Sequence, residues 1–269
     1  MSGAPSLGTE AHERNFAKSL EAFIGDIAAL GLERKPDSWG GTGVFATQAL
    51  PNGIVLQIPL HFVLDVAAAA RTVLGSQLVA AGFTFGETQL LVLAAARHDS
   101  ASPFAPYAAT LPTTSPDPLC WPAQARALLT GTDLGSSLIA AEEEMQTFSS
   151  KVTSCGLLPS AVTLDDLCWA RGMILSRRFP AMSTNLGSSD IVPAPAKTEE
   201  NIGGLATPGA LLPLVDILNH SPAADVTWSR DQASDKNSEN HFTISNPAPL
   251  AAGDEAFNYY GSRTKVNCN

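Results

Sequence analysis

Basic residues are scarce in this chain. Asp and Glu outnumber Lys and Arg by 26 to 16, so the formal net charge is −10, and the isoelectric point lies near 4.9. A protein that binds nucleic acid needs a basic face to neutralise phosphates, so this composition argues against nucleic acid as the main partner. A basic peptide or protein, in contrast, would be attracted by the negative charge.

Long apolar runs are also missing. No apolar stretch reaches the roughly 18 residues that span a bilayer, and the first ten residues lack the basic start and apolar core of a signal peptide. We therefore expect an intracellular protein, in the cytoplasm or the nucleus, without membrane contact. The few cysteines lie far apart with no C-x-x-C pair, which indicates buried, reduced thiols rather than a zinc or redox site. They are Cys120, Cys155, Cys168 and Cys268.

Three common catalytic signatures are absent from the sequence. The glycine-rich stretch at residues 40–43 has no G-K-[ST] ending, so it is not a phosphate-binding P-loop. No HExxH pair occurs, which argues against a catalytic metal. A Ser-His-Asp hydrolase is disfavoured because the chain contains no G-x-S-x-G elbow.

The apolar content is high enough for a substantial core. The 269 residues are 45% apolar, which fits one large globular domain or two ordinary ones. Residues 12–30 carry apolar side chains at helical spacing, and Gly31 follows as a stop. Residues 38–46 run from a glycine-rich turn into a strand, and a turn at residues 50–53 leads into a second strand at residues 54–59. Together these two strands predict a β-hairpin.

The middle of the chain is rich in helix formers. Helices are predicted at residues 66–81, 87–97, 123–129, 135–152 and 164–176, with a proline-punctuated link at residues 104–118. Polar loops are predicted at residues 183–210 and 229–240, and a strand at residues 241–245. Because strands flank this helical block on both sides, the N-terminal hairpin and the C-terminal strands must meet in space to share a core.

Three polar residues interrupt the apolar run at residues 211–222. Asp216, Asn219 and His220 have i, i+3, i+4 spacing, so on a helical turn they would share one face. Such a run is normally buried, so these side chains must find hydrogen-bond partners inside or line a pocket. His220 could serve as a metal ligand or a general base, but the next histidine, His241, lies beyond a polar loop.

Three other stretches have an ordinary structural explanation beside a functional one. Gly40-Gly41-Thr42-Gly43 can form the edge of a hairpin or bring backbone close to a ligand. Ser176 and Arg177 close a predicted helix, where a cation interacts favourably with the helix dipole. One guanidinium could instead bind a carboxylate through two hydrogen bonds. Tyr259-Tyr260 can be strand aromatics or can present a hydroxyl beside Gly261.

Taken together and in this order, the stretches resemble the SET-domain protein methyltransferases of the Rubisco large-subunit lysine methyltransferase subgroup. The resemblance extends from about Trp39 to Gly261, nearly the whole chain, and the combination is specific although no single piece is. The matching segments are residues 41–46, 51–53, 58–59, 111–112, 118–121, 169, 176–179, 213–221 and 253–261.

The resemblance implies an α+β architecture, a mostly-β SET fold of small sheets with a large helical insertion. In that fold the segment of Asn219 and His220 and the segment of Tyr260 pass through one another as a pseudoknot. Residues 1–64 would hold the N-terminal helix and the N-terminal part of the SET domain. Residues 65–173 would form the helical insertion, and residues 174–269 the C-terminal part of the SET domain.

The resemblance also implies an enzyme that transfers a methyl group from S-adenosylmethionine to a lysine side chain of a protein, without a metal. Tyr260 matches the family's catalytic tyrosine, and Arg177 the residue at the cofactor carboxylate. We expect the protein to be a monomer. The cofactor-binding residues implied by the resemblance are Gly40, Gly41, Thr42, Gly43, Ser176, Arg177, Asp216, Asn219, His220 and Tyr260.

The chain departs from the family's pattern after the Tyr-Gly motif. The family continues with a further aromatic that packs over the cofactor and with an all-helical domain that holds the protein substrate, whereas this sequence stops at Asn269. We therefore expect a truncated SET domain that lacks the substrate-binding domain. Two alternatives stay open: a SET-like binding module with weak or no activity, and a methyltransferase of the same subgroup that acts on histidine.

Overall fold

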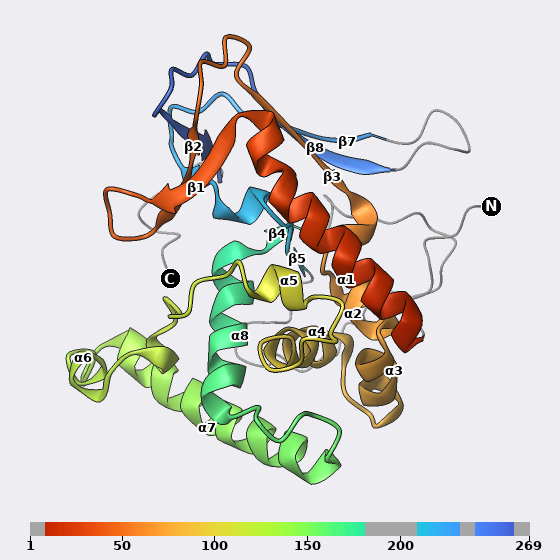
Figure 1. Ribbon diagram of the computed structural model, residues 1–269. Coiled ribbons are helices and arrows are strands. Elements are labelled where there is room, and N and C mark those ends of the chain that lie inside the picture. The colour runs from red at the N-terminus through yellow and green to blue at the C-terminus, as the bar shows by residue number, and fades with distance from the viewer. Residues whose placement is uncertain (1–8, 181–208, 232–239, 261–269) are drawn as a thin grey trace.

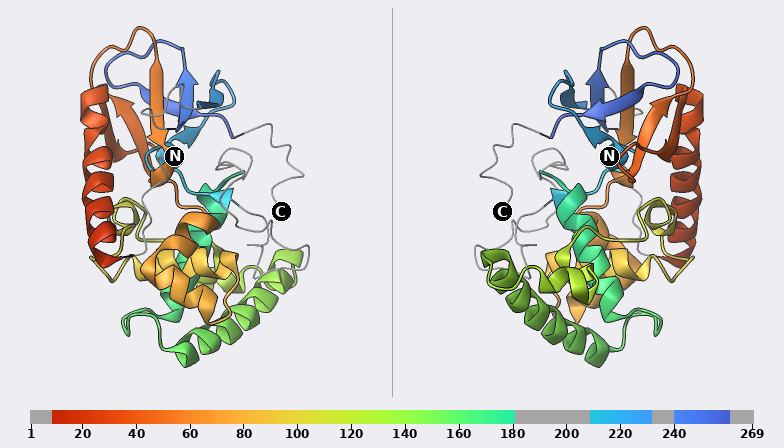
Figure 2. Two further views of the ribbon diagram at one scale, coloured as in Figure 1. Left: turned by 90° about the vertical axis from the view of Figure 1, so that its right-hand side faces the viewer. Right: turned by 90° about the vertical axis from the view of Figure 1, so that its left-hand side faces the viewer.

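The chain divides into a strand-rich end and a helix-rich end, with the first helix running along both (Figure 1). The computed structural model describes residues 9–180, 209–231 and 240–260. Two side views show the same division, with the strands gathered at one end and the helices of the middle of the chain at the other (Figure 2). Strands from the two ends of the sequence therefore lie together.

The first helix, α1 (Glu10–Gly25), begins at Thr9, whose side chain caps the first turn. It continues as the 3-10 turn η1 (Asp26–Leu30) and ends at Gly31, whose φ of 72° is left-handed. Glycine adopts this conformation without a steric penalty. Phe16 of α1 packs into the core of the helix-rich end. The helix predicted over residues 12–30 is confirmed, with a tighter last turn.

Within the described residues the strands form three small sheets. The four-stranded sheet has the order β1-β2-β9-β6, the three-stranded sheet the order β3-β8-β7, and β4 pairs with β5. Both larger sheets pair a strand from the start of the chain with one from its end, as predicted. The bounds are β1 (Leu32–Pro36), β2 (Thr42–Ala46), β3 (Ile54–Pro59), β4 (Phe179–Pro180), β5 (Gly209–Ala210), β6 (Asn219–His220), β7 (Thr227–Asp231), β8 (His241–Asn246) and β9 (Glu255–Asn258).

The predicted hairpin between residues 38–46 and 54–59 is wrong in its pairing. β2 pairs antiparallel with β1, and β3 pairs with β8 in the other sheet. The strand β1 escaped prediction because its sequence LERKP has only Leu32 buried, so no apolar alternation marks it. After β2 the chain crosses to the second sheet, where Leu50 forms a bridge with Leu250.

The two predicted polar loops fall largely outside the described residues. Of the loop at residues 183–210, only Gly209 and Ala210 are described, and they form β5. The loop predicted at residues 229–240 is wrong at its start, because β7 extends to Asp231 and is held there by antiparallel pairing with β8. The strand predicted at residues 241–245 is confirmed as β8.

Each helix predicted in the middle of the chain is present, with changes at some boundaries. The helix predicted at residues 66–81 is divided in two, because Thr72 is extended and its side chain caps the second piece at the Gly75 amide. None of the described helices is long and apolar enough to cross a membrane. The bounds are η2 (Leu60–Phe62), α2 (Val66–Arg71), α3 (Val73–Ala80), α4 (Phe85–Ala95), α5 (Ala105–Ala108), η3 (Pro118–Cys120), α6 (Ala123–Ala127), α7 (Asp133–Cys155), α8 (Leu164–Arg177) and η5 (Val215–Ile217).

Two hydrophobic clusters stabilise the fold, one in each end. The helix-rich cluster includes Phe104 and Tyr107 of the α5 region, and the sheet-rich cluster includes Phe242 of β8. The two clusters adjoin where Leu64 pairs with Leu211 in an antiparallel bridge. Residues just after β3 and just before η5 therefore connect the helices to the sheets. The division of the chain at residues 64/65 and 173/174 stays a prediction.

Gly53 lies where the N-terminal and C-terminal segments approach through their backbones. Its φ is 69°, and a Cβ at this position would overlap the carbonyl oxygen of Asn246. We expect Gly53→Ala to lower the free energy of unfolding by about 2–4 kcal/mol, because a left-handed conformation costs about 1–2 kcal/mol and the backbone must also shift. Denaturant unfolding measures the change.

The matched control is Gly253→Ala. Gly253 has a φ of 92°, but no atom lies within 4 Å of the added Cβ, so only the conformational cost of about 1–2 kcal/mol applies. Equal losses in the two variants would contradict the importance of the close approach to β8.

Candidate functional site

The parallel pairing of two short strands brings the predicted site segments side by side. Asn219 of β6 lies opposite Phe257 of β9, and His220 lies opposite Asn258. The pairing continues past β6, where the Ser221 amide donates to the Asn258 carbonyl at 3.0 Å. Tyr260 follows β9 after a single residue and so emerges beside His220.

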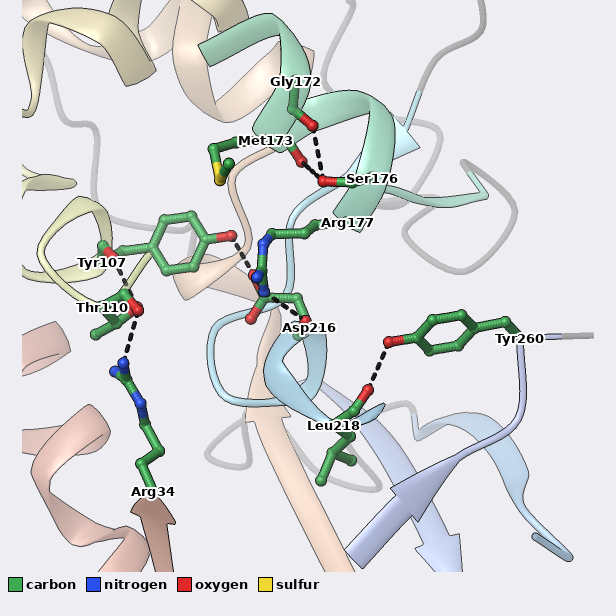
Figure 3. A network of polar contacts seen from close by, with 10 residues as sticks. All are labelled: Arg34, Tyr107, Thr110, Gly172, Met173, Ser176, Arg177, Asp216, Leu218 and Tyr260. Carbon is green, nitrogen blue, oxygen red and sulfur yellow. Dashed lines mark hydrogen bonds and ion pairs between the residues drawn. The ribbon is translucent and has the colours of Figure 1, made fainter. Parts of the chain in front are cut away.

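Tyr260 is held at three points next to β6. Its amide donates to Nδ1 of His220 at 3.1 Å, and the two rings stack with their centroids 5.3 Å apart. Its hydroxyl donates to the main-chain carbonyl of Leu218 at 2.5 Å (Figure 3). Because 37% of Tyr260 is exposed, the ring stays accessible while its hydroxyl is fixed at a backbone carbonyl.

The glycine-rich turn before β2 is organised by Asp37. One oxygen of its carboxylate accepts hydrogen bonds from the Trp39 amide at 2.8 Å and from the Gly41 amide at 2.7 Å. Between them Gly40 has a φ of 84°, which favours glycine. Desolvation acts to raise the pKa of Asp37, but the hydrogen bonds from this turn and from Asn219 outweigh it and lower the pKa below the usual aspartate value.

The side-chain amide of Asn219 ties this turn to the paired strands. Its Nδ2 donates to Oδ2 of Asp37 at 2.9 Å and to Oε1 of Glu255 at 2.6 Å. Both hydrogens of the amide are thus engaged, each with a carboxylate. Gly43 packs so closely against Glu255 that a Cβ there would overlap the same carboxylate. The glycine turn, β6 and β9 are therefore joined through one amide.

Arg177 ends α8 and points toward the turn η5. Its Nη1 donates to the main-chain carbonyl of Asp216 at 2.7 Å and lies 3.8 Å from Oδ2 of the same residue. Its Nε is buried and has no hydrogen-bond partner among the described residues. The neighbouring Ser176 hydroxyl bonds back to the Gly172 carbonyl at 2.7 Å. Of these two predicted residues, Arg177 is the one whose side chain bonds another segment among the described residues.

Asp216 has a fully buried side chain. Oδ2 accepts a hydrogen bond from the Tyr107 hydroxyl at 2.6 Å, whereas Oδ1 has no partner among the described residues. Burial raises the pKa of Asp216 above the usual aspartate range, against the opposing effects of the Arg177 charge and the Tyr107 hydroxyl. The free-energy cost of removing the carboxylate from water therefore exceeds the stabilisation that Arg177 and Tyr107 provide, as is common for buried charges.

Asp216, Asn219 and His220 do not lie on one helical turn, so the shared face that their spacing would give there is not formed. Asp216 lies in η5, while Asn219 and His220 lie on the strand β6. Asp216 consequently contacts the helix-rich end through Tyr107, and Asn219 contacts the glycine turn. The chain changes from a 3-10 turn to a strand because β9 offers β6 a parallel partner, which local spacing does not reveal.

Three site residues were missed by the sequence reasoning: Asp37, Tyr107 and Glu255. Asp37 could have been found, since an aspartate just before a glycine turn often accepts hydrogen bonds from the following amides. Tyr107 and Glu255 carry no local signal. Their roles depend on contacts with Asp216 and Asn219, which are far away in the sequence.

The potential metal ligands and the thiols of the described residues form neither a metal cluster nor a disulfide. Within the described residues, no group of three or more His, Cys, Asp or Glu side chains is placed to hold a metal ion. Cys120, Cys155 and Cys168 are free thiols, and of these only Cys168 is buried. Its pKa is raised to about 12, mainly by burial, so this thiol is unreactive. Cys268 lies outside the described residues.

Solved structures share the fold of this chain, although no family model matches it. The SET domain of LSMT bound to lysine and AdoHcy superposes with a TM-score of 0.67 at 19% identity, covering 92% of this chain and 54% of that one. This chain has a SET-domain fold. Rubisco LSMT bound to AdoMet superposes with a TM-score of 0.64, also at 19% identity, covering 91% of this chain and 53% of that one.

Curated relatives of this SET-domain chain carry names of lysine or Rubisco methyltransferases. The chain is 24% identical over 230 residues to "[Fructose-bisphosphate aldolase]-lysine N-methyltransferase, chloroplastic" of Arabidopsis thaliana, covering 82% of this chain and 43% of that protein. It is 25% identical over 234 residues to the chloroplastic Rubisco large subunit N-methyltransferase of Nicotiana tabacum, covering 82% and 42%. The chain thus spans less than half the length of these relatives. The predicted SET fold and the resemblance to the Rubisco methyltransferase subgroup are confirmed.

The two hydrogen bonds from the Asn219 amide to Asp37 and Glu255 can be tested through the stability of the fold. Asn219→Asp replaces a double donor by a third carboxylate facing Asp37 and Glu255, so we expect a lower free energy of unfolding at pH 7. The loss should shrink at pH 4, where carboxylates begin to be protonated. Urea unfolding at both pH values measures it.

Glu255→Gln in the Asn219→Asp background provides the control, because an amide at position 255 restores one donor to the pair. It should recover part of the stability at pH 7. A double variant no more stable than Asn219→Asp would show that the two side chains do not interact.

Proposed function

We propose that this protein is an S-adenosylmethionine-dependent protein-lysine N-methyltransferase with Tyr260 as its catalytic residue. The proposal is carried by one observation: the Tyr260 hydroxyl donates to the Leu218 carbonyl, between η5, whose Asp216 binds Arg177, and β6, which pairs with β9. In this arrangement a hydroxyl and a backbone carbonyl can face one amine.

The residues around this edge fit the cofactor. The buried Nε of Arg177 is a donor without a partner among the described residues, as a binding site for a carboxylate requires. At Gly40 there is open space where a side chain would begin, so a ligand could approach the turn at this residue. We assign cofactor binding to Gly40, Gly41, Thr42, Gly43, Ser176, Arg177, Asp216, Asn219, His220 and Tyr260.

When bound, the cofactor would supply a methyl group on a positively charged sulfonium. The protein must then hold the lysine nitrogen in line with that methyl at about 3 Å, which is a proximity effect. A lysine ammonium with a pKa of about 10.4 has to lose its proton first, and neighbouring positive charge and apolar surroundings both favour the neutral amine. Tyr260 and the Leu218 carbonyl would orient the amine and stabilise charge around the moving methyl.

A protein lysine fits the charge of the chain as substrate. The formal net charge of −10 attracts basic segments of a partner protein. The curated relatives are named for methylation of fructose-bisphosphate aldolase and of the Rubisco large subunit. We propose a protein lysine as the acceptor, without assigning either of these two proteins as the substrate.

Tyr260→Phe removes the hydroxyl and keeps the ring that stacks on His220. We expect methyl transfer to fall at least 100-fold, the size of effect seen when one catalytic hydrogen-bonding group is lost. Cofactor affinity should change less than about 3-fold, because the stacking is retained. Transfer is measured with radiolabelled cofactor and fractionated lysate, and affinity by calorimetry.

Tyr259→Phe is the neighbouring control and should keep wild-type transfer. Near-normal turnover by Tyr260→Phe would show that the Tyr260 hydroxyl is not needed for catalysis. Wild-type protein that binds the cofactor but transfers no label would point to the binding module instead. Label recovered on histidine after hydrolysis of the product would point to the histidine methyltransferase.

Arg177→Lys keeps the positive charge but loses the planar fork of donors. We expect cofactor affinity to fall about 10-fold or more, because the compact ammonium lacks the planar fork that holds the Asp216 carbonyl on one edge and can offer separate donors to a ligand carboxylate. Arg178→Lys is the adjacent control and should leave affinity within about 3-fold of wild type. Calorimetric titration measures both, and similar affinities in the two variants would exclude Arg177 from the cofactor site.

A further inference from the structure

A chain of polar contacts connects the helix-rich end to the candidate site (Figure 3). Nη2 of Arg34 donates to the Thr110 carbonyl at 2.8 Å, and the Thr110 hydroxyl donates to the Tyr107 carbonyl at 2.7 Å. The Tyr107 hydroxyl then donates to Oδ2 of Asp216 at 2.6 Å, and Asp216 accepts a hydrogen bond from Arg177 through its main chain. Tyr107 belongs to α5, so a helix of the middle block reaches the SET core through one hydroxyl.

We propose that Tyr107 is a positioning residue for the cofactor site, holding the Asp216 carboxylate so that Asp216 fixes the guanidinium of Arg177. The inference rests on the proposed function, in which Arg177 binds the cofactor carboxylate. Tyr107 acts through Asp216 and makes no contact of its own with the ligand.

The geometry supports this order of contacts. Oδ2 of Asp216 receives the Tyr107 hydroxyl at 2.6 Å and also lies 3.8 Å from Nη1 of Arg177. The same Nη1 is bonded to the Asp216 main chain at 2.7 Å. The guanidinium is thus held on one edge by Asp216, while its buried Nε has no partner among the described residues. If the Asp216 carboxylate rotated so that Oδ2 left the Tyr107 hydroxyl, its contact with Nη1 of Arg177 would also be lost.

The energetics explain why a hydroxyl matters at this position. The side chain of Asp216 is fully buried, and that of Arg177 is 19% exposed, so the carboxylate has lost nearly all of its hydration. The groups that favour its charged form are Arg177 from α8, Tyr107 from α5 and Arg34 from β1. Tyr107 is itself fully buried, and its pKa is raised well above the usual value by burial and by the charge of Asp216. It therefore remains a donor over the whole working pH range.

Removing the hydroxyl should act through the charge of Asp216. In Tyr107→Phe the carboxylate loses a charge-assisted hydrogen bond, which further raises the pKa of Asp216. A larger share of the molecules then carries a neutral Asp216 that no longer attracts Arg177. Because the pKa of Asp216 is already raised in the wild type, the effect should grow as the pH falls from neutral toward the acidic range.

The experiment is calorimetric titration of S-adenosylmethionine into wild type and Tyr107→Phe between about pH 5.5 and 8, a range that covers both the neutral and the mildly acidic side. We expect about 10-fold weaker binding by Tyr107→Phe at pH 7, equivalent to about 1.4 kcal/mol. The acid-side loss of affinity should begin at a higher pH in the variant. Equal affinity and an equal pH profile in the two proteins would overturn the inference.

Two further variants separate positioning from a general loss of stability. Thr110→Val removes the neighbouring hydroxyl, which bonds only the Tyr107 carbonyl among the contacts of Figure 3, and should leave affinity and pH profile unchanged. In an Asp216→Asn background, Tyr107→Phe should cause no more than about a 2-fold further loss. A loss in Thr110→Val equal to that in Tyr107→Phe, or a full 10-fold loss in the Asp216→Asn background, would overturn the inference.

The outcome for the wild type distinguishes this inference from the proposed function. Wild-type protein that does not bind the cofactor would overturn the proposed function, and the inference with it. Wild-type protein that binds, combined with an unaffected Tyr107→Phe, would overturn only the role of Tyr107. Circular dichroism and thermal unfolding of each variant confirm that the protein tested is folded.

Discussion

The amide of Asn219 is the contact on which the candidate site depends. Its two hydrogens join Asp37, at the glycine turn, to Glu255, on β9, while its backbone pairs with Phe257. Three segments from the beginning and the end of the chain are thus fixed at one point. Two carboxylates facing each other would repel, so a neutral double donor between them is what lets both lie there. The position of Tyr260 follows from the same strand pairing.

A second constraint comes from burying the charge of Asp216. Its raised pKa shows that desolvation outweighs the attraction of Arg177 and the hydrogen bond from Tyr107. A buried pair of this kind contributes little net stability, because the loss of hydration offsets the attraction between the charges. The pair holds the end of α8 against η5, and the Nε of Arg177 is left without a partner among the described residues. The helix-rich end, through α5, shares in building that part of the site.

Local elements were predicted well where their signal is local. α1, α4, α7 and α8 have apolar side chains at helical spacing and polar residues that cap their first turns. The pairing of strands was predicted poorly. β2 and β3 are neighbours in sequence, yet they belong to different sheets, in which β2 pairs with β1 and β9 and β3 pairs with β8. No periodicity in either strand encodes that choice.

The sequence alone determined the helices, the apolar strands, the residues that resemble the SET motifs and, through their order, the fold. The helices and strands follow from side-chain spacing and from turn residues, which act over a few positions, whereas the fold was implied by the resemblance of the ordered motifs to the SET family. Only the tertiary structure decided that Asp216 faces Tyr107 while Asn219 faces Asp37, and that β1 rather than β3 pairs with β2. Those outcomes depend on hydrogen bonds and packing between residues far apart in the chain, and such partners exist only once the chain has folded.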